Sequence, residues 1–285
     1  MIPTAFDYIR ATSVDDALAK LSAANGEGKL IAGGHSLVPL MKFRLAEAKT
    51  LIDIGRIPEL SGIRKKSEVI EIGAGTIHHD VATSALLLQE CPLAAEAAAT
   101  IGDPQVRNRG TLGGSLAHAD PSADYPAVML ALDADIHVKG PKGARIVKAK
   151  DFFRGLFTVD LAADEIIVAV RFTPVKSAAY AKLYQRASHF AIVGVAAAVS
   201  VDQGVITSAR IGLTGAGPCA TRLTAVEEAL AGKPVSTSSV DAATRAAGAM
   251  MDDLNSDLHA SREYRRAMIP VFTERALATA LARAR

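Results

Sequence analysis

Residues 100–126 read TIGDPQVRNRGTLGGSLAHADPSADYP, and this stretch decides how the rest of the chain is organised. It contains four glycines, three prolines and three aspartates, and no helical or strand-like hydrophobic period runs through it. An irregular run of this length inside a domain is either a disordered linker or a functional loop system. Its varied composition and its apolar flanks favour a functional loop system.

A second glycine turn, LIAGGHSLVP at residues 30–39, follows a predicted strand at residues 29–32. Glycine lets the backbone approach a ligand closely and adopt positive φ, and consecutive backbone N–H groups form an anion-binding nest. Each of the two loops combines a Gly-Gly pair with a hydroxyl residue: Gly33, Gly34 and Ser36 in one, Gly113, Gly114 and Thr111 in the other. One such pair fits a plain tight turn equally well, whereas two in one domain predict a site for the two phosphates of a dinucleotide.

Composition narrows the class of protein further. The chain has 285 residues, of which 49% are hydrophobic, and a net charge of +2. This length and composition predict a sizeable core in two domains, or in one domain with a subdomain, and the charge predicts no nucleic-acid partner. No apolar run reaches the roughly 18 residues of a membrane helix, and no signal peptide follows Met1. Only Cys91 and Cys219 are present, too few for an iron–sulfur cluster with four thiolate ligands. We therefore expect a cytoplasmic protein with two reduced thiols.

Strand and helix signals divide the chain into two parts. Residues 63–72 predict a hairpin, residues 79–88 and 92–101 two helices, and EIIVAVRF at 165–172 a buried strand that ends before Pro174. Three consecutive strands are predicted at 180–186, 190–201 and 205–213, followed by three helices at 223–230, 240–251 and 262–283. A strand meander followed by helices predicts an α+β second domain, with the boundary at residues 174–177.

The sequence does not match the motifs of several other kinds of binding or catalytic site. Gly73-Ala74-Gly75 and Gly215-Ala216-Gly217 lack the third glycine of a Rossmann fingerprint, and there is no Walker A lysine pattern. The stretch GHSLV at residues 34–38 lacks the final glycine of a nucleophile elbow. Adjacent His78 and His79 would point to different faces and are unfavourable for a metal site. His118 is either a ligand contact or a hydrogen-bond partner that braces its loop.

Taken together, AGGHSLVPLMKFRLA at 32–46 and IGDPQVRNRGTLGGSLAHADPSADYPAVMLAL at 101–132 resemble the FAD-binding medium subunits of molybdenum hydroxylases, of the carbon monoxide dehydrogenase and nicotine dehydrogenase type. The resemblance extends over the whole chain, including FDYIRATSVDDALAKL near the start and SDLHASREYRRAM near the end. It implies an α+β fold, in which a two-part FAD-binding domain of the vanillyl-alcohol-oxidase (PCMH) type occupies residues 1–175. A smaller C-terminal domain, with a three-stranded sheet and helices, would occupy residues 176–285.

The resemblance also implies cofactor-binding residues. One phosphate loop would consist of Leu30, Ile31, Ala32, Gly33, Gly34, His35, Ser36 and Leu37, and the second of Thr111, Gly113, Gly114 and Ser115. Ile101 would lie against the flavin, Asp124 would hydrogen-bond a cofactor hydroxyl, and Ile167 would pack on the ligand. Many relatives have Asn where Ser115 stands, and Asp-Tyr where His189-Phe190 stand. Near Tyr184, where some relatives place a lysine, this chain has Lys182 and Arg186.

By this resemblance the chain is a flavoprotein that carries electrons within a larger enzyme and has no catalytic residues of its own. An iron–sulfur small subunit with [2Fe–2S] clusters would deliver electrons to FAD, a large subunit would hold the molybdenum cofactor, and an external acceptor would take the electrons. The assembly implied is a dimer of heterotrimers. A stand-alone FAD-dependent oxidase of the same fold and a non-enzymatic FAD-binding scaffold are the alternatives. Phe152, Phe153 and Phe157 are candidates either for a partner surface or for ordinary core packing.

Overall fold

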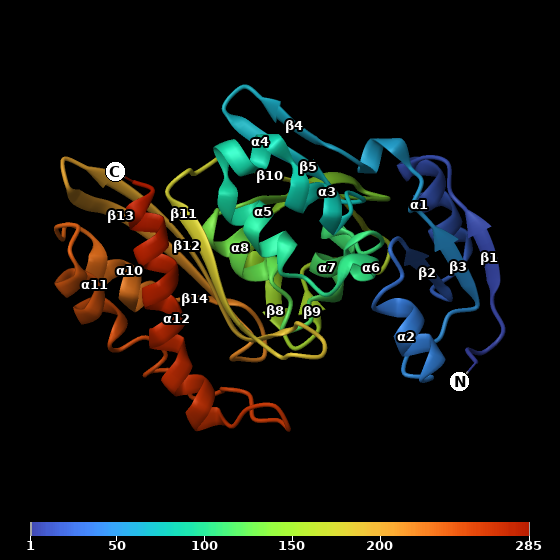
Figure 1. The fold of residues 1–285 in the computed structure, drawn as a ribbon. Helices are drawn as coiled ribbons and strands as arrows, with labels where there is room; N and C mark the ends of the chain where they lie inside the picture. Colours follow the sequence, from blue (N-terminus) through green and yellow to red (C-terminus); the bar gives the residue numbers. More distant parts are fainter. Residues whose placement is uncertain (1, 285) are drawn as a thin grey trace.

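Three lobes follow one another along the chain in the computed structural model, which describes residues 2–284. A small parallel sheet (blue), a central group of helices on a five-stranded sheet (teal and green) and a C-terminal sheet with helices (yellow to red) lie side by side in that order (Figure 1). The middle lobe touches both of the others, and helices α6 and α7 face the N-terminal lobe.

The N-terminal lobe is built on a three-stranded parallel sheet with the order β1-β3-β2. Its elements are β1 (Asp7–Arg10), α1 (Val14–Ala23), β2 (Gly28–Ile31), α2 (Leu37–Lys42) and β3 (Thr50–Asp53). Helix α1 begins where the sequence predicts a helix start, because the Ser13 side chain accepts a hydrogen bond from the Asp16 N–H at 3.0 Å. The connection from β2 to α2 is the first glycine loop.

The middle lobe contains an antiparallel sheet with the order β4-β5-β10-β6-β7. Its strands are β4 (Ile63–Lys66), β5 (Val69–Gly73), β6 (Asp135–Gly140), β7 (Gly143–Lys148) and β10 (Ile166–Phe172), and the 3-10 helix η1 (Pro58–Leu60) precedes them. The predicted hairpin at 63–72 and the predicted strand at 165–172 are both confirmed. Strand β10 lies at the centre of the sheet, which explains why it is apolar along nearly its whole length.

Two predictions in this lobe are wrong. The single helix expected at 79–88 is two helices, α3 (His78–Thr83) and α4 (Ala85–Glu90), because Ser84 has an extended backbone and caps α4 by accepting from the Leu87 N–H. The run at 100–126 is more ordered than a loop and contains α6 (Pro104–Arg107) and α7 (Leu112–His118). These helices are one to two turns long, too short to show a hydrophobic period.

Helix α5 (Pro92–Ala99) and helix α8 (Tyr125–Ala131) lie between the middle sheet and the C-terminal lobe. The short elements α9 (Ala149–Phe152), β8 (Phe153–Gly155) and β9 (Thr158–Val159) complete the middle lobe. Phe152 is fully buried and Phe153 is 9% exposed, so both pack in the core and the partner-surface alternative is wrong for them. Phe157 is exposed at the turn between β8 and β9.

The C-terminal lobe confirms the three predicted consecutive strands, but the expected three-stranded sheet is wrong: a fourth strand, too short to show a pattern in the sequence, pairs beside β13 to give the order β11-β12-β13-β14. Its elements are β11 (Ala178–Tyr184), β12 (Ala191–Asp202), β13 (Val205–Thr214), β14 (Thr221–Arg222), α10 (Thr224–Leu230), α11 (Thr237–Thr244) and α12 (Arg262–Ala282). Alternate residues of β12 enter different cores: Ala196 and Ala198 join the middle lobe, whereas Val195 and Val199 pack with the C-terminal helices. Both faces of the sheet are therefore buried, which explains the unbroken apolar run in the sequence.

The chain passes from β10 to β11 through residues 173–177. The division into residues 1–175 and 176–285 stays a prediction, and its outer ends, Met1 and Arg285, lie outside the described residues. Among residues 2–284, no helix has both the length and the apolar character needed to span a bilayer.

Candidate functional site

The first glycine loop presents a row of free backbone donors. Within residues 2–284, the N–H groups of the five consecutive residues 33–37 have no hydrogen-bond acceptor. Gly34 has a φ of +74°, the left-handed conformation that glycine adopts without strain. His35 is exposed, and its Nδ1 lies 3.1 Å from the Gly33 carbonyl oxygen. Successive N–H groups around a left-handed residue form an anion-binding concavity, so the local geometry fits a phosphate.

The two glycine loops meet, as the dinucleotide hypothesis requires. A Cβ at Gly33 would lie 2.2 Å from the carbonyl oxygen of Arg109, so only glycine lets the loops approach this closely. Residue 109 stands two positions before the Thr111 cap of α7 and two positions after Arg107. Because two residues span at most about 7 Å, the first loop, the start of α7 and the Arg107 backbone belong to one small region.

The second loop has a different character from the first. Its backbone donors are already used: Leu112 N–H donates to Thr76 O at 3.0 Å, Gly113 N–H to Ala74 O at 2.7 Å, and Gly114 N–H to Thr111 Oγ1 at 3.1 Å. A Cβ at Gly113 would lie 2.5 Å from the Cβ of Ala74, so this glycine is required for packing.

Two residues of the second loop remain accessible to a ligand: Gly114, which is exposed, and Ser115, which is half-buried. Gly114 lies in the first turn of α7 without positive φ. A row of free N–H groups is therefore found in the first loop alone, and the second loop would contribute close approach and a hydroxyl.

A pocket of about 430 Å³ adjoins this region, between the middle lobe and strand β11. It is lined by Ala99, Thr100, Gly102, Asp103, Pro104, Arg107, Tyr180, Lys182, Tyr184 and His189. Arg107 donates from Nη1 to the carbonyl oxygens of Ile101 and Gly102 at 3.0 and 2.9 Å, and has no carboxylate partner within the described chain. The volume of the pocket is in the range of small-molecule and cofactor sites.

Asp124 forms a buried ion pair with Lys182, one of the residues that line this pocket. Its carboxylate accepts from Lys182 Nζ at 2.8 Å and from the Tyr180 hydroxyl at 2.6 Å. The Asp124 and Lys182 side chains are 4% and 3% exposed. Burial raises the pKa of Asp124 and lowers the pKa of Lys182, while each partner stabilises the charge of the other. Lys182 Nζ also donates to the Thr100 carbonyl at 3.1 Å, so the pair joins β11 to the middle lobe.

The two predicted apolar contacts lie on the flanks of the region. Ile101 is half-buried and packs against the main core directly before Gly102 of the pocket. Ile167 is 5% exposed in β10. Its neighbour Val168 accepts from the Ala74 N–H at 3.0 Å, and Ala74 in turn accepts from Gly113. Ile167 is thus connected to the second loop through the backbone.

None of the ten residues that line the pocket belongs to the predicted cofactor-binding set, although the family resemblance drew attention to Lys182, Tyr184 and His189. Arg107, Lys182 and His189 are the three of them with a cationic or imidazole side chain. The signal for Arg107 was present, since it stands within the stretch 100–126. Lys182 lies in β11, which packs against α5, and His189 lies in the turn after β11 and contacts the Gly102 carbonyl. Residue spacing does not reveal these long-range contacts.

Two further histidines, His78 and His118, are accounted for by packing. His78 is buried against Gly110 and Tyr125, with ring centroids of His78 and Tyr125 5.3 Å apart, and burial lowers the pKa of His78 to about 4. His118 packs against Phe157 at 5.2 Å between ring centroids, and burial lowers its pKa. Among residues 2–284, no group of three or more His, Cys, Asp or Glu side chains is arranged to hold a metal ion.

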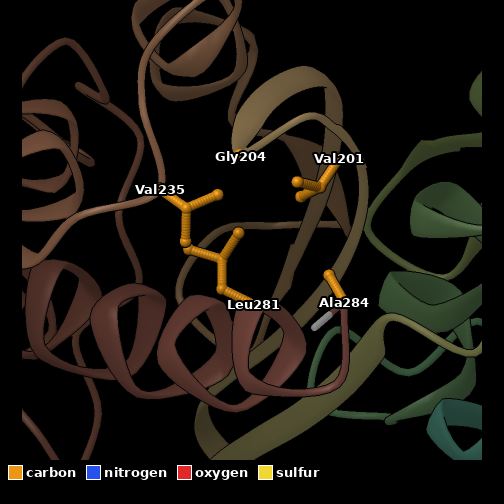
Figure 2. A pocket seen from close by; sticks show the side chains of 5 residues that line it. All are labelled: Val201, Gly204, Val235, Leu281 and Ala284. Carbon is orange, nitrogen blue, oxygen red and sulfur yellow. The ribbon is translucent and has the colours of Figure 1, made fainter.

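A second hollow, in the C-terminal lobe, does not compete with this site. Figure 2 shows it between the end of α12 and the turn from β12 to β13. It has a volume of about 300 Å³ and is lined by Val201, Gly204, Val235, Leu281 and Ala284. These residues are all apolar and offer no polar or charged side chain to orient a ligand.

Comparison with known proteins defines the class to which this fold and site belong. Residues 4–174 match the family described as the FAD-binding domain in molybdopterin dehydrogenase, and residues 178–280 match the CO dehydrogenase flavoprotein C-terminal domain. The protein is thus an α+β FAD-binding domain followed by a CO dehydrogenase flavoprotein domain.

Individual relatives indicate the type of subunit to which this chain is similar. The carbon monoxide dehydrogenase medium chain of Hydrogenophaga pseudoflava is 40% identical over 99% of both chains. The 6-hydroxypseudooxynicotine dehydrogenase complex subunit alpha of Paenarthrobacter nicotinovorans is 41% identical over 100% of this chain and 97% of that protein. The solved structure of the Hydrogenophaga pseudoflava carbon monoxide dehydrogenase superposes with a TM-score of 0.95 at 42% identity, covering 99% of both chains. The chain therefore belongs to the FAD-binding medium subunits of carbon-monoxide-dehydrogenase-like molybdenum hydroxylases, and is an oxidoreductase subunit.

Proposed function

We propose that this chain binds FAD at the two glycine loops and the adjoining pocket, and serves as the electron-transfer subunit of a heteromeric molybdenum hydroxylase. The observation that carries the proposal is the row of five unsatisfied N–H groups at 33–37, held against the loop that leads to a pocket of about 430 Å³. A dinucleotide needs both features, because its pyrophosphate is anionic and its ring system is large and flat. The described residues therefore fit the cofactor.

Different residues of the site would bind different parts of the cofactor. The N–H groups of residues 33–37 would hold the pyrophosphate, while Gly114 would permit close approach and the Ser115 hydroxyl would donate a hydrogen bond. Ile101 and Ile167 would supply apolar contact. Asp124 already accepts from Tyr180 and Lys182, but a carboxylate has about four acceptor positions, so a cofactor hydroxyl could still bond to it.

FAD, when bound, supplies one- and two-electron redox chemistry that no side chain of this protein offers. The chain itself binds and orients the cofactor and sets the charge around it. Its two cysteines, a buried Cys91 and a half-buried Cys219, cannot ligate an iron–sulfur cluster. We therefore assign the [2Fe–2S] clusters to a small subunit that would deliver electrons here, and the molybdenum cofactor to a large subunit.

The family resemblance supports a dimer of heterotrimers in the cytoplasm, with an external electron acceptor. The relatives carry names that refer to different substrates, including carbon monoxide and 6-hydroxypseudooxynicotine. Since these relatives share one overall sequence pattern, we place the choice of substrate on another subunit. The exposed Phe157 remains a candidate for contact with a partner.

The test compares flavin reduction in the purified native complex and in the isolated chain. We expect substrate to bleach the flavin absorbance of the complex and to leave the flavin of the isolated chain oxidised. Dithionite, which needs no partner, should reduce both and serves as the control. Reduction of the isolated chain by an organic substrate would instead support the stand-alone oxidase. A complex whose flavin stays oxidised with every substrate of its molybdenum subunit would support the non-enzymatic scaffold.

A further inference from the structure

His189 lines the pocket in a conformation that fixes which ring nitrogen carries the proton. Its Nδ1 lies 2.8 Å from the carbonyl oxygen of Gly102. A carbonyl oxygen only accepts hydrogen bonds, so Nδ1 must be the protonated nitrogen. In the neutral ring the other nitrogen, Nε2, is then an acceptor, and it has no hydrogen-bond partner within residues 2–284.

The imidazole ring is held from several sides. The Gly102 carbonyl also accepts from Arg107 Nη1 at 2.9 Å, so one oxygen ties two pocket side chains together. Tyr184 packs edge-on against His189, with ring centroids 5.4 Å apart. The His189 backbone has a φ of +62°, a costly conformation for a non-glycine residue, and its N–H donates to the Gln185 carbonyl at 2.8 Å. Backbone strain of this kind persists where surrounding contacts impose it.

Several charged and titratable side chains surround the imidazole ring of His189. The charged and titratable side chains that line the pocket with it are Asp103, Arg107, Lys182 and Tyr184, and Arg186 stands exposed in its own turn. Lys182 is neutralised by Asp124. Arg107 is a fixed cation of the same pocket, and Asp103 is the carboxylate among its lining residues. Histidine is the ordinary side chain that changes charge between about pH 5 and pH 8.

We propose that His189 is a proton-accepting residue of the cofactor pocket, which takes up a proton at Nε2 when the pocket gains negative charge on reduction. The inference rests on the proposed FAD site. Two electrons, supplied in the test by dithionite, enter the bound cofactor, and one solvent proton binds Nε2; no covalent bond to the protein forms. The proton compensates added negative charge in a partly buried site. Reduction of the cofactor is thereby coupled to pH through this chain's own residue.

The experiment measures the two-electron midpoint potential of the FAD-loaded full chain between pH 5.5 and 8.5. Two variants accompany the wild type. His189→Asn keeps an N–H for the Gly102 carbonyl and a residue type that tolerates positive φ, but cannot take up a proton. His259→Asn is the matched control, because His259 is exposed and does not line the pocket. Nitrogen-15 NMR of histidine in the FAD-free chain reports the tautomer independently of the cofactor.

We expect the wild type and His259→Asn to show a pH interval in which reduction takes up one more proton per two electrons than in His189→Asn. That difference equals a slope steeper by about 30 mV per pH unit. The NMR spectrum should show a protonated Nδ1 and an unprotonated Nε2 at the alkaline end. Equal slopes in all three proteins with FAD bound, or a protonated Nε2 in the neutral ring, would overturn the inference alone. A wild-type chain that fails to bind FAD would overturn the proposed function and this inference with it.

Discussion

Alanine substitutions at two neighbouring glycines of the second loop should separate its packing role from its role at the cofactor. A Cβ at Gly113 would lie 2.5 Å from the Cβ of Ala74 and 2.9 Å from its carbonyl oxygen. Ordinary carbon contacts lie at about 3.5–4.0 Å, so the backbone of α7 must move by about 1 Å. We expect Gly113→Ala to cost about 2–4 kcal/mol, from overpacking and from the strained hydrogen bond to Ala74 O.

Gly114→Ala should leave stability almost unchanged. The one nearby atom is Thr111 Oγ1, 2.8 Å from the new Cβ, and rotating this hydroxyl away costs at most the helix cap, about 1 kcal/mol. Replacing glycine by alanine within a helix gains a similar amount. The added methyl group stands on the exposed side of the loop, however, and would keep a phosphate group from the backbone. We expect the affinity for FAD to fall at least about tenfold, or 1.4 kcal/mol, and Gly114→Val to abolish FAD retention.

Two measurements check the pair. Thermal unfolding of the FAD-free chain should show a melting temperature lower by roughly 5–15 °C for Gly113→Ala and little changed for Gly114→Ala. Titration with FAD, followed by flavin fluorescence, should show the loss of affinity in Gly114→Ala. Ala117→Ser, at an exposed position later in α7, is the control for both. Wild-type affinity in Gly114→Ala and Gly114→Val would refute the placement of this loop at the cofactor.

The remaining predictions concern the cofactor link, the buried ion pair and a buried histidine. Acid precipitation should release all FAD, because we expect noncovalent binding with no bond to His35 or His118; yellow colour left in the pellet would contradict this. Asp124→Asn leaves the ammonium group of Lys182 buried without a carboxylate, so urea unfolding should show a free energy of unfolding lower by about 3–5 kcal/mol. Adding Lys182→Met should recover much of this loss. If the losses of the two substitutions simply add, the result would argue against the ion pair. Burial lowers the pKa of His78 from 6.5 to about 4, so the unfolded chain binds more protons between these values, and the free energy of unfolding should fall as pH drops from 6.5 to 4, by on the order of 3 kcal/mol. His78→Gln should lose this part of the pH dependence in urea titrations, and an unchanged profile would show that another group causes it.

The sequence was most informative where local patterns decide structure. Strand β12 and its neighbours follow from unbroken apolar runs, and α1 from the Ser13 cap. The contact between the two glycine loops was also foreseeable, since one dinucleotide must touch both. Helices α6 and α7 could not be foreseen. Each begins at a side-chain cap, Asp103 for α6 and Thr111 for α7, in a stretch too short to show a hydrophobic period.

Long-range contacts explain what could not be predicted at the site. Asp124 and Lys182 are 58 residues apart, and nothing in their spacing indicates a buried ion pair. The Gly113-Gly114 motif gives no sign that its first residue is required for packing and its second remains open, since that difference depends on Ala74 in another segment. For the same reason, Gly102 and His189, 87 residues apart, join in one pocket wall only in the folded chain.

The most direct test of the electron-transfer account is the composition of the native protein. Size-exclusion chromatography with analysis of flavin, iron and molybdenum should find this chain with FAD in a complex that contains an iron–sulfur subunit and a molybdenum subunit, in equal numbers. Because each [2Fe–2S] cluster holds two iron atoms, the clusters of the small subunit predict at least four iron atoms for each FAD. A monomer that is free of iron and molybdenum, yet oxidises an organic substrate at rates typical of enzymes, on the order of 1–1000 per second, would contradict the account.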